Sequence, residues 1–317
     1  MSFYWMRRTF LVLVSGAALL MAGCGSGTIE SQFHPARLVV FGTGISDLGQ
    51  GGSRYTVNDG GIDTWTQKVA ANYGLTLATA AGGGTSFATG NVRIKNKPDA
   101  AGNSATPTVT EQIDGFLAGG GIGANDLLIV EAGTSDIVAE MAKVTAGTQT
   151  QDQMIAALQQ AGRDFAAQVR RLVDAGAQHV MVVGSYDLGR TPWATATSQQ
   201  SLLTTATTKF NGELLVSMVE LGQNVLYVDA ALLYNLAIST PTNYGMSNSI
   251  AAVCTSVDPG PGIGIGTGQV NSALCTPTTV PANVDYNQFV FADRVYPSPA
   301  AHRQFGDYAY NAIHNRF

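Results

Sequence analysis

The stretch 40-VFGTGISDLG-49 decides the fold of this chain. The hydrophobic run Leu38–Phe41 has the length and composition of a buried strand, and it ends abruptly in Gly42-Thr43-Gly44. Glycine accepts the backbone conformations of a sharp turn, so the chain should bend here. Ser46-Asp47 then suits the start of a helix, because short polar side chains cap helix N-termini. The stretch therefore predicts a strand, a tight turn and a helix.

The same alternation continues along the rest of the chain. Apolar runs suited to buried strands recur at 127–132, 179–185 and 224–229, with a weaker one at 75–80. Helical segments are expected at 62–74, 153–177, 196–222 and from Ser298-Pro299 to about 314. Strands that alternate with helices predict an α/β protein, a three-layer α/β/α sandwich around a mostly parallel sheet.

Ligands of open parallel sheets bind at the carboxyl ends of the strands. Residues 42–49, 133–136 and 293–302 should gather at that edge, because each segment follows a predicted strand or begins a predicted helix. The site is therefore expected among these three segments.

The composition limits the class of protein. The chain has 317 residues, 45% of them hydrophobic, which suits one large domain, predicted at 37–317. A net charge of −5 and 12% charged residues argue against a nucleic-acid partner, which would require a basic face. Gly82-Gly83-Gly84 lacks the lysine of a phosphate-binding loop, so no nucleotide is predicted; we expect neither a cofactor nor a metal site, and the sequence indicates no oligomeric state.

The first 23 residues have the features of a targeting segment. Arg7 and Arg8 precede an apolar stretch, 9–23, which is short for a membrane-spanning helix. Small residues then precede Cys24, which resembles the lipobox of bacterial lipoproteins, whose cysteine is acylated and anchors the protein to the membrane. An ordinary secretory signal with a chance cysteine is the alternative.

The residues around the predicted cleavage point indicate a location. Gly25, in place of aspartate, resembles the sorting pattern of outer-membrane lipoproteins in Gram-negative envelopes. Residues 24–36 are then expected to be a lipidated tether. Export places the chain in an oxidising compartment, so Cys254 and Cys275 are expected to form a disulfide; two free thiols are the alternative.

Four blocks in order resemble the SGNH/GDSL family of esterases and acylhydrolases, from about residue 37 to the C-terminus. The family's Gly-Asp-Ser-Leu-Ser-Asp-x-Gly corresponds to 42-GTGISDLG-49, and its glycine-rich second block to 79-TAAGGG-84. Its Gly-x-Asn-Asp corresponds to 133-GTSD-136, and its final block to 293-DRVYPSPAAH-302. The resemblance implies a five-stranded sheet in the flavodoxin-like order 2-1-3-4-5, and it implies a helix at 109–120.

The departures from the family pattern concern its chemistry. In the family, a serine at the position of Gly44 attacks an ester carbonyl, and a histidine at the position of Tyr296 takes its proton. An aspartate, here Asp293, orients that histidine. The family's oxyanion hole corresponds to Gly84 and Ser135, where Ser135 replaces an asparagine amide. We therefore expect a degenerate catalytic triad of which Asp293 alone survives.

Two residues offer alternative chemistry. Ser46 could be a displaced nucleophile, which would make the chain an active ester hydrolase, or it could cap a helix. His302 could be a base or a structural residue. The hydroxyls of Thr43, Ser46, Ser135 and Tyr296 would instead suit a pocket for a polar ligand, such as a sugar or an acylated glycan. A structural role without a ligand remains open.

Overall fold

The computed structural model describes residues 33–62, 64–260 and 267–317. The predicted signal peptide and Cys24 lie outside these residues. The compact unit begins at Phe33, inside the segment predicted as a tether. The Phe33 ring is buried and stacks on His179 at 3.9 Å between centroids, so the last tether residues already belong to the domain. No described helix is both long and apolar enough to cross a membrane.

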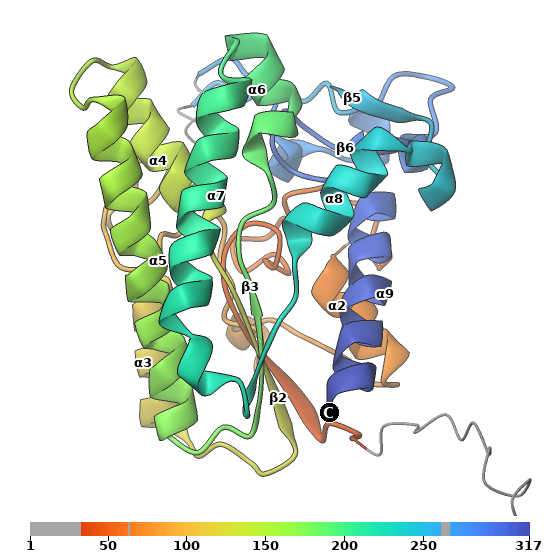
Figure 1. Ribbon diagram of the computed structural model, residues 1–317. Coiled ribbons are helices and arrows are strands. Elements are labelled where there is room, and N and C mark those ends of the chain that lie inside the picture. Colours follow the sequence, from red (N-terminus) through yellow and green to blue (C-terminus); the bar gives the residue numbers. More distant parts are fainter. Residues whose placement is uncertain (1–32, 63, 261–266) are drawn as a thin grey trace, which may run out of the picture. The chain divides into compact units, whose positions relative to one another are not determined.

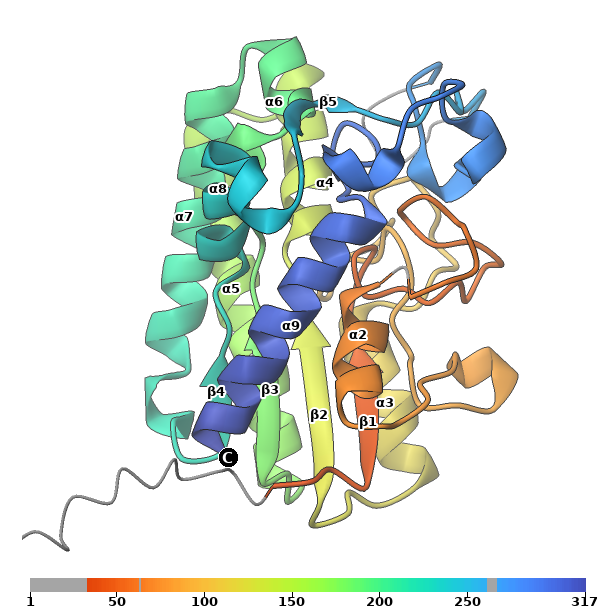
Figure 2. The ribbon, with the colours of Figure 1, turned by 90° about the vertical axis from the view of Figure 1, so that its right-hand side faces the viewer.

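The centre of the domain is a sheet of four parallel strands in the order β1-β2-β3-β4 (Figures 1 and 2). The strands are β1 Arg37–Phe41, β2 Asp126–Glu131, β3 His179–Val183 and β4 Val225–Tyr227. In register, Val40 pairs with Ile129 and Ile129 pairs with Met181. Every residue of β2 is buried, as expected for a central parallel strand that is covered on both faces.

The predicted fifth strand at 75–80 is wrong. An irregular segment takes its place beside β1: Val40 N donates to Thr85 O at 3.0 Å, and Phe87 N donates to Val40 O at 2.7 Å. Residues 78–80 pair with Ser86 instead of with β1: Ser86 N donates to Ala78 O at 3.0 Å, and Ala80 N donates to Ser86 O at 2.7 Å. A second, two-stranded sheet that the sequence did not reveal pairs β5 Asn248–Ala252 with β6 Phe289–Phe291.

Helices cover both faces of the sheet, which confirms the three-layer sandwich (Figures 1 and 2). Helices α3, α4, α5 and α7 lie on one side, and α2 and α9 lie on the other. Their bounds, with those of α6 and α8, are α2 Trp65–Asn72, α3 Val109–Gly119, α4 Thr134–Thr145, α5 Gln151–Asp174, α6 Pro192–Thr197, α7 Gln200–Ser217, α8 Ala230–Ser239 and α9 Pro299–Arg316.

Local sequence explains where several helices begin and end. Ser298 caps α9 by accepting from Ala301 N at 3.2 Å, as the sequence predicts. The helix predicted at 196–222 divides into α6 and α7, because Ser198 adopts a left-handed conformation that ends α6. Helices α4 and α8 were not predicted.

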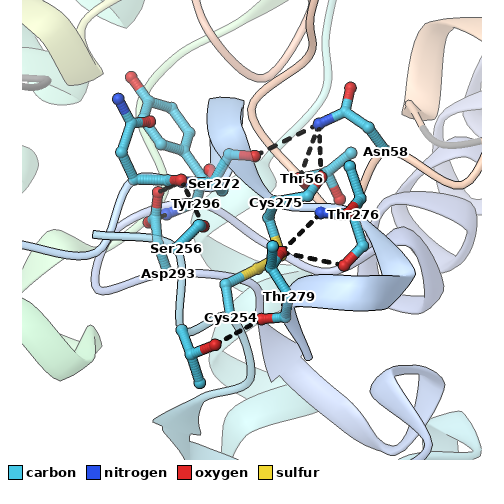
Figure 3. Close-up of a disulfide and its surroundings, with 12 residues drawn as sticks. Thr56, Asn58, Cys254, Ser256, Ser272, Cys275, Thr276, Thr279, Asp293 and Tyr296 are labelled. Atoms are coloured by element: carbon cyan, nitrogen blue, oxygen red, sulfur yellow. Dashed lines mark hydrogen bonds between the residues drawn. A yellow bond between two sulfur atoms is a disulfide. The ribbon is translucent and has the colours of Figure 1, made fainter. Parts of the chain in front are cut away.

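The predicted disulfide between Cys254 and Cys275 is confirmed, with 5.9 Å between the two Cα atoms (Figure 3). Both cysteines are buried in a small second core with Val57, Val253 and Ala292. The bridge ties the loop between β5 and β6 to this core. Ser272, three residues before Cys275, donates its backbone N–H to Asp293, so the bridge supports a residue of the final family block.

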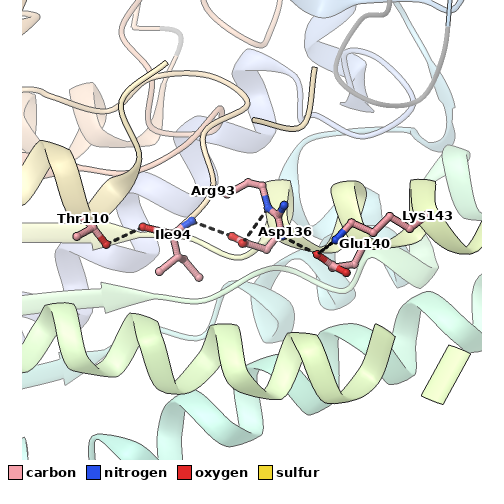
Figure 4. A network of polar contacts seen from close by, with 6 residues as sticks. All are labelled: Arg93, Ile94, Thr110, Asp136, Glu140 and Lys143. Atoms are coloured by element: carbon pink, nitrogen blue, oxygen red, sulfur yellow. Dashed lines mark hydrogen bonds and ion pairs between the residues drawn. The ribbon is translucent and has the colours of Figure 1, made fainter. Parts of the chain in front are cut away.

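A buried ion-pair network fixes the loop that precedes α3 (Figure 4). The Arg93 guanidinium contacts Asp136 at 3.3 Å and Glu140 at 2.6 Å, and Asp136 also accepts from Ile94 N. Burial raises the pKa of Asp136 to about 6, although Arg93 opposes the shift. Asp136 of the third block therefore has a structural partner and holds this loop against α4.

Candidate active site

The turn after β1 depends on close backbone approach. A Cβ added to Gly42 would lie 2.7 Å from the backbone oxygen of Glu131, so only glycine fits. The Gln112 side chain holds Gly42 from the other side: it accepts from Gly42 N at 2.9 Å and donates to Gly42 O at 3.1 Å. The helix expected after Ser46 is absent. The chain instead continues as irregular backbone until α2 begins at Trp65.

Tyr296 occupies the space above Gly44. A Cβ added to Gly44 would lie 2.7 Å from Cε1, Cζ and Oη of the Tyr296 ring. Tyr55 packs on that ring with 4.9 Å between centroids, and Asn91 donates to the Tyr55 hydroxyl at 2.8 Å. Tyr296 is only 2% exposed. The space next to Gly44, where the sequence analysis expected the nucleophile position, is therefore filled by an aromatic ring, and a second ring supports the first.

The Tyr296 hydroxyl does not have the properties of a base. Burial, followed by the nearby Tyr55, Asp293 and Glu131, raises its pKa well above the usual value, so the phenol stays protonated at neutral pH. Ser135 lowers that pKa slightly through its hydroxyl, yet the two residues form no hydrogen bond of ordinary geometry.

A buried carboxylate lies beneath the turn. Glu131 ends β2, is fully buried, and accepts from Thr43 N at 3.0 Å, from Thr43 Oγ1 at 3.0 Å and from Ser46 Oγ at 3.0 Å. Trp65 Nε1 donates to the same Ser46 oxygen at 3.2 Å. Burial raises the pKa of Glu131 to about 7, against the opposing effect of these hydrogen bonds.

These contacts define the role of the Ser46 hydroxyl in the structure. Its hydroxyl is fully buried and is shared between a carboxylate and an indole, so it caps no helix and has no imidazole among its described partners. The sequence analysis missed Glu131. The available signal was a single charged residue next to the end of the otherwise apolar run 127–132.

The Asp293 carboxylate accepts hydrogen bonds from backbone N–H groups and not from a histidine. Its Oδ1 accepts from Val295 N at 2.8 Å and from Tyr296 N at 2.6 Å, and its Oδ2 accepts from Ser272 N at 2.9 Å. Burial raises its pKa, while these donors oppose the shift. The carboxylate shapes the loop that carries the Tyr296 ring over Gly44.

His302 lies in α9 and is completely buried, and neither ring nitrogen has a hydrogen-bond partner among the described residues. Burial lowers its pKa to about 3, so the imidazole is neutral at physiological pH. Its buried position and lack of a hydroxyl partner give no geometry for a Ser46–His302 pair.

The two oxyanion-hole positions differ from each other. Gly84 donates its N–H to Thr79 O at 2.8 Å, which occupies the donor that a substrate oxyanion would need. Ser135, in the first turn of α4, is buried and its hydroxyl has no hydrogen-bond partner among the described residues.

The four hydroxyl residues predicted to line a pocket do come together, but they are packed. Thr43, Ser46, Ser135 and Tyr296 are each at most 2% exposed. The cavity beside them, about 450 Å³, is lined by other residues, among them Gln50, Phe87 and Gln112. Within the described ranges, no three His, Cys, Asp or Glu side chains are grouped to hold a metal ion.

Comparison with known proteins identifies the fold family. The family model described as GDSL-like Lipase/Acylhydrolase matches residues 38–309. The chain belongs to the GDSL-like lipase/acylhydrolase family. The structure places Gly44 and Tyr296, the two residues that the sequence analysis assigned to the nucleophile and base positions, side by side.

Two more distant likenesses accompany this match. A Pseudomonas putida protein, described as an uncharacterized protein in the trpE-trpG intergenic region, is 24% identical over 339 residues, which cover 97% of this chain. The chain spans about half the length of that relative, 53%. A crystal structure with 13% sequence identity aligns over 89% of this chain and 97% of its own, with a TM-score of 0.45.

A mutational cycle tests the packing over Gly44. We expect Gly44→Ala to lower the free energy of unfolding by about 1–3 kcal/mol, because the new methyl group overlaps the Tyr296 ring. In a Tyr296→His background the loss should shrink, since imidazole is shorter than phenol. Urea denaturation measures all four proteins. Gly212→Ala in α7, where a Cβ meets nothing within 4 Å, is the control. Equal effects at Gly44 and Gly212 would contradict the packing.

The buried Glu131 predicts a pH-dependent stability. Its folded pKa, about 7, lies above the ordinary value of 4.5, so the native state binds more protons between these pH values. The protonated Glu131 side chain makes its full contribution to the free energy of unfolding below about pH 4.5. This contribution is lost as the pH rises through 7. The stability of the wild type relative to Glu131→Gln should fall by about 2–3 kcal/mol from pH 5 to pH 8.

Urea denaturation at pH 5, 6, 7 and 8 measures this difference. Asp47, Asp136 and Asp293 also have raised pKa values, but they are common to both proteins and cancel. Glu220→Gln, the same substitution at a side chain that is 79% exposed, is the surface control. Parallel curves for wild type and Glu131→Gln would show that Glu131 does not titrate in this range.

Proposed function

We propose that this chain is an exported, lipid-anchored GDSL-fold protein of a Gram-negative outer membrane whose catalytic site is degenerate. It acts by binding a ligand, for which a polar or acylated glycan is the proposed class, or it has a structural role in the envelope. The observation that carries the proposal is the Tyr296 ring, which fills the space over Gly44 where a nucleophile and its substrate would have to meet.

The expected loss of catalytic turnover supports the proposal that the site is degenerate. Removal of a triad nucleophile lowers turnover by roughly 10⁶, and loss of one oxyanion-hole donor lowers it by about 10²–10³. Here the nucleophile position is glycine, the base position is a protonated phenol, and the Gly84 N–H is already bonded to Thr79. No described neighbour of Ser46 replaces the missing imidazole.

Ester hydrolysis gives the direct test. Purified residues 25–317 should neither hydrolyse short-chain p-nitrophenyl esters above background nor react with a fluorophosphonate probe, while circular dichroism shows a folded protein. The alternative is an active ester hydrolase that uses Ser46 or another hydroxyl. Turnover and labelling that persist in Gly44→Ala but disappear in Ser46→Ala would establish that alternative and overturn the proposal.

The proposed anchor is tested at Cys24. Wild-type protein expressed in a Gram-negative host should incorporate radiolabelled palmitate and sediment with the outer membrane, because several acyl chains hold a protein firmly in a bilayer. Cys24→Ala should lose the label. Cys254→Ser is the matched control, since Cys254 lies in the disulfide and should not affect acylation. Unlabelled wild-type protein in the soluble periplasmic fraction would rule out the anchor.

A further inference from the structure

The chain enters the domain at the amino edge of the central sheet, where its four strands begin. The Phe33 ring lies 3.9 Å from that of His179, the first residue of β3, and 5.8 Å from that of Phe317, between centroids. Arg316 donates to the backbone oxygen of Gly222, in the loop before β4. Figures 1 and 2 both show the C-terminus at this end of the sheet. The start of the domain, its C-terminus and the loop before β4 therefore lie together.

The loops of this edge carry few charges. Residues 120–125 lead into β2, 175–178 into β3 and 218–224 into β4. The first two loops contain no Asp, Glu, Lys or Arg. In the third, Glu220 pairs with Arg170 of α5 at 3.6 Å. The loops therefore present a nearly neutral surface.

The charged residues that border these loops nearly cancel. Arg37 and Asp126, the first residues of β1 and β2, pair with each other at 2.7 Å. Asp174, at the end of α5, and Arg316, at the end of α9, add one charge of each sign. This edge therefore neither strongly attracts nor strongly repels a charged surface.

Apolar side chains project from the same edge. Leu215, Val216 and Val219, at the end of α7 and in the turn that follows it, are 44%, 72% and 76% exposed. Their neighbours Met218 and Leu221 are buried, so this segment is apolar on its outer as well as its inner side. Adjacent apolar side chains in solvent favour a partner that removes them from water.

The length of chain before Phe33 limits what can cover these side chains. Cys24, the proposed site of acylation, precedes Phe33 by nine residues, which span at most about 30 Å when fully extended. Helix α9, which ends at this edge, is itself about 27 Å long by helix geometry. A lipid on Cys24 therefore keeps the amino edge close to the bilayer. Because an anchor raises the local concentration of its surface, a small apolar patch is enough for docking.

We infer that the amino edge of the sheet docks on the phospholipid surface that holds the anchor, with Leu215, Val216 and Val219 in contact with the lipid. The inference rests on the proposed anchor at Cys24. These side chains enter the boundary between headgroups and acyl chains, where an apolar group gains free energy by leaving water. The turn at 42–46, at the carboxyl edge of the sheet, then faces away from the membrane and toward ligands in solution.

The test anchors the protein chemically, so it does not depend on acylation in the cell. Residues 24–317 are coupled through Cys24 to a maleimide phospholipid in phosphatidylcholine vesicles, while Cys254 and Cys275 are protected by their disulfide. Gln223→Trp places a fluorescent reporter in the loop before β4. We expect brominated acyl chains to quench about half of its emission, because the docked loop lies at the edge of the acyl region.

A second reporter measures the opposite end of the domain. Ile250, in β5, is 83% exposed, and Figures 1 and 2 both show β5 at the end away from the C-terminus. Ile250→Trp should keep its emission in the same vesicles. Trp65 and Trp193 are buried, and the protein without an added reporter gives their contribution.

Paired substitutions locate the contact. In the Gln223→Trp protein, Val216→Gln with Val219→Gln should remove most of the quenching, because the edge loses its most exposed apolar side chains. Leu232→Gln with Leu236→Gln is the matched control: these leucines of α8 are 50% and 46% exposed, and α8 begins at the carboxyl end of β4. This pair should leave the quenching unchanged. Circular dichroism checks that every variant is folded.

The inference is overturned if the two reporters are quenched equally or not at all. It is also overturned if the valine pair keeps full quenching, or if the leucine pair lowers it as much as the valine pair does. A host that leaves Cys24 without a lipid would contradict the proposed anchor in the palmitate experiment. It would not change the result in these vesicles, so the two failures are distinguishable.

Discussion

The structure of the turn at 42–46 depends on one buried carboxyl group. Glu131 closes the central strand β2 and receives the backbone and hydroxyl of Thr43 and the hydroxyl of Ser46. Burial of a carboxyl group is costly unless donors surround it, and these hydrogen bonds offset part of that cost. The turn between β1 and the following loop thus has its polar groups directed down into the sheet and away from solvent.

Above that turn the packing is aromatic. Glycine at position 44 removes the side chain that would face the cleft, and the Tyr296 ring fills the space, supported by Tyr55. Asp293 holds the backbone of Val295 and Tyr296 and so sets the position of the ring. Gly44 and Tyr296 therefore form one packing arrangement, in which the missing side chain at Gly44 leaves room for the ring.

The same arrangement buries the hydroxyl groups around the turn. The hydroxyls that a sequence motif would assign to a cleft are buried in hydrogen bonds, while the open cavity lies to the side, along α3. Gln112 connects the two, since its side chain both lines the cavity and clamps Gly42.

Local sequence was sufficient for the sandwich, the four main strands and the capped start of α9 at Ser298, because periodicity and caps act over short distances. The Cys254–Cys275 bridge could be predicted because these are the two cysteines of the predicted domain 37–317. It failed at 75–80, where a tertiary hydrogen bond from Val40 to Thr85 selected another segment for the edge of β1.

The sequence by itself determined that Gly44 has no attacking oxygen and that Tyr296 has no imidazole. Only the tertiary structure decided that the two lie in contact, that Ser46 belongs to Glu131, and that Asp293 serves backbone N–H groups. The physical reason is that these partners are 85 residues apart for Ser46 and Glu131 and more than 200 apart for Gly44 and Tyr296. Contacts at such separations come from how the strands and helices pack, which no local pattern encodes.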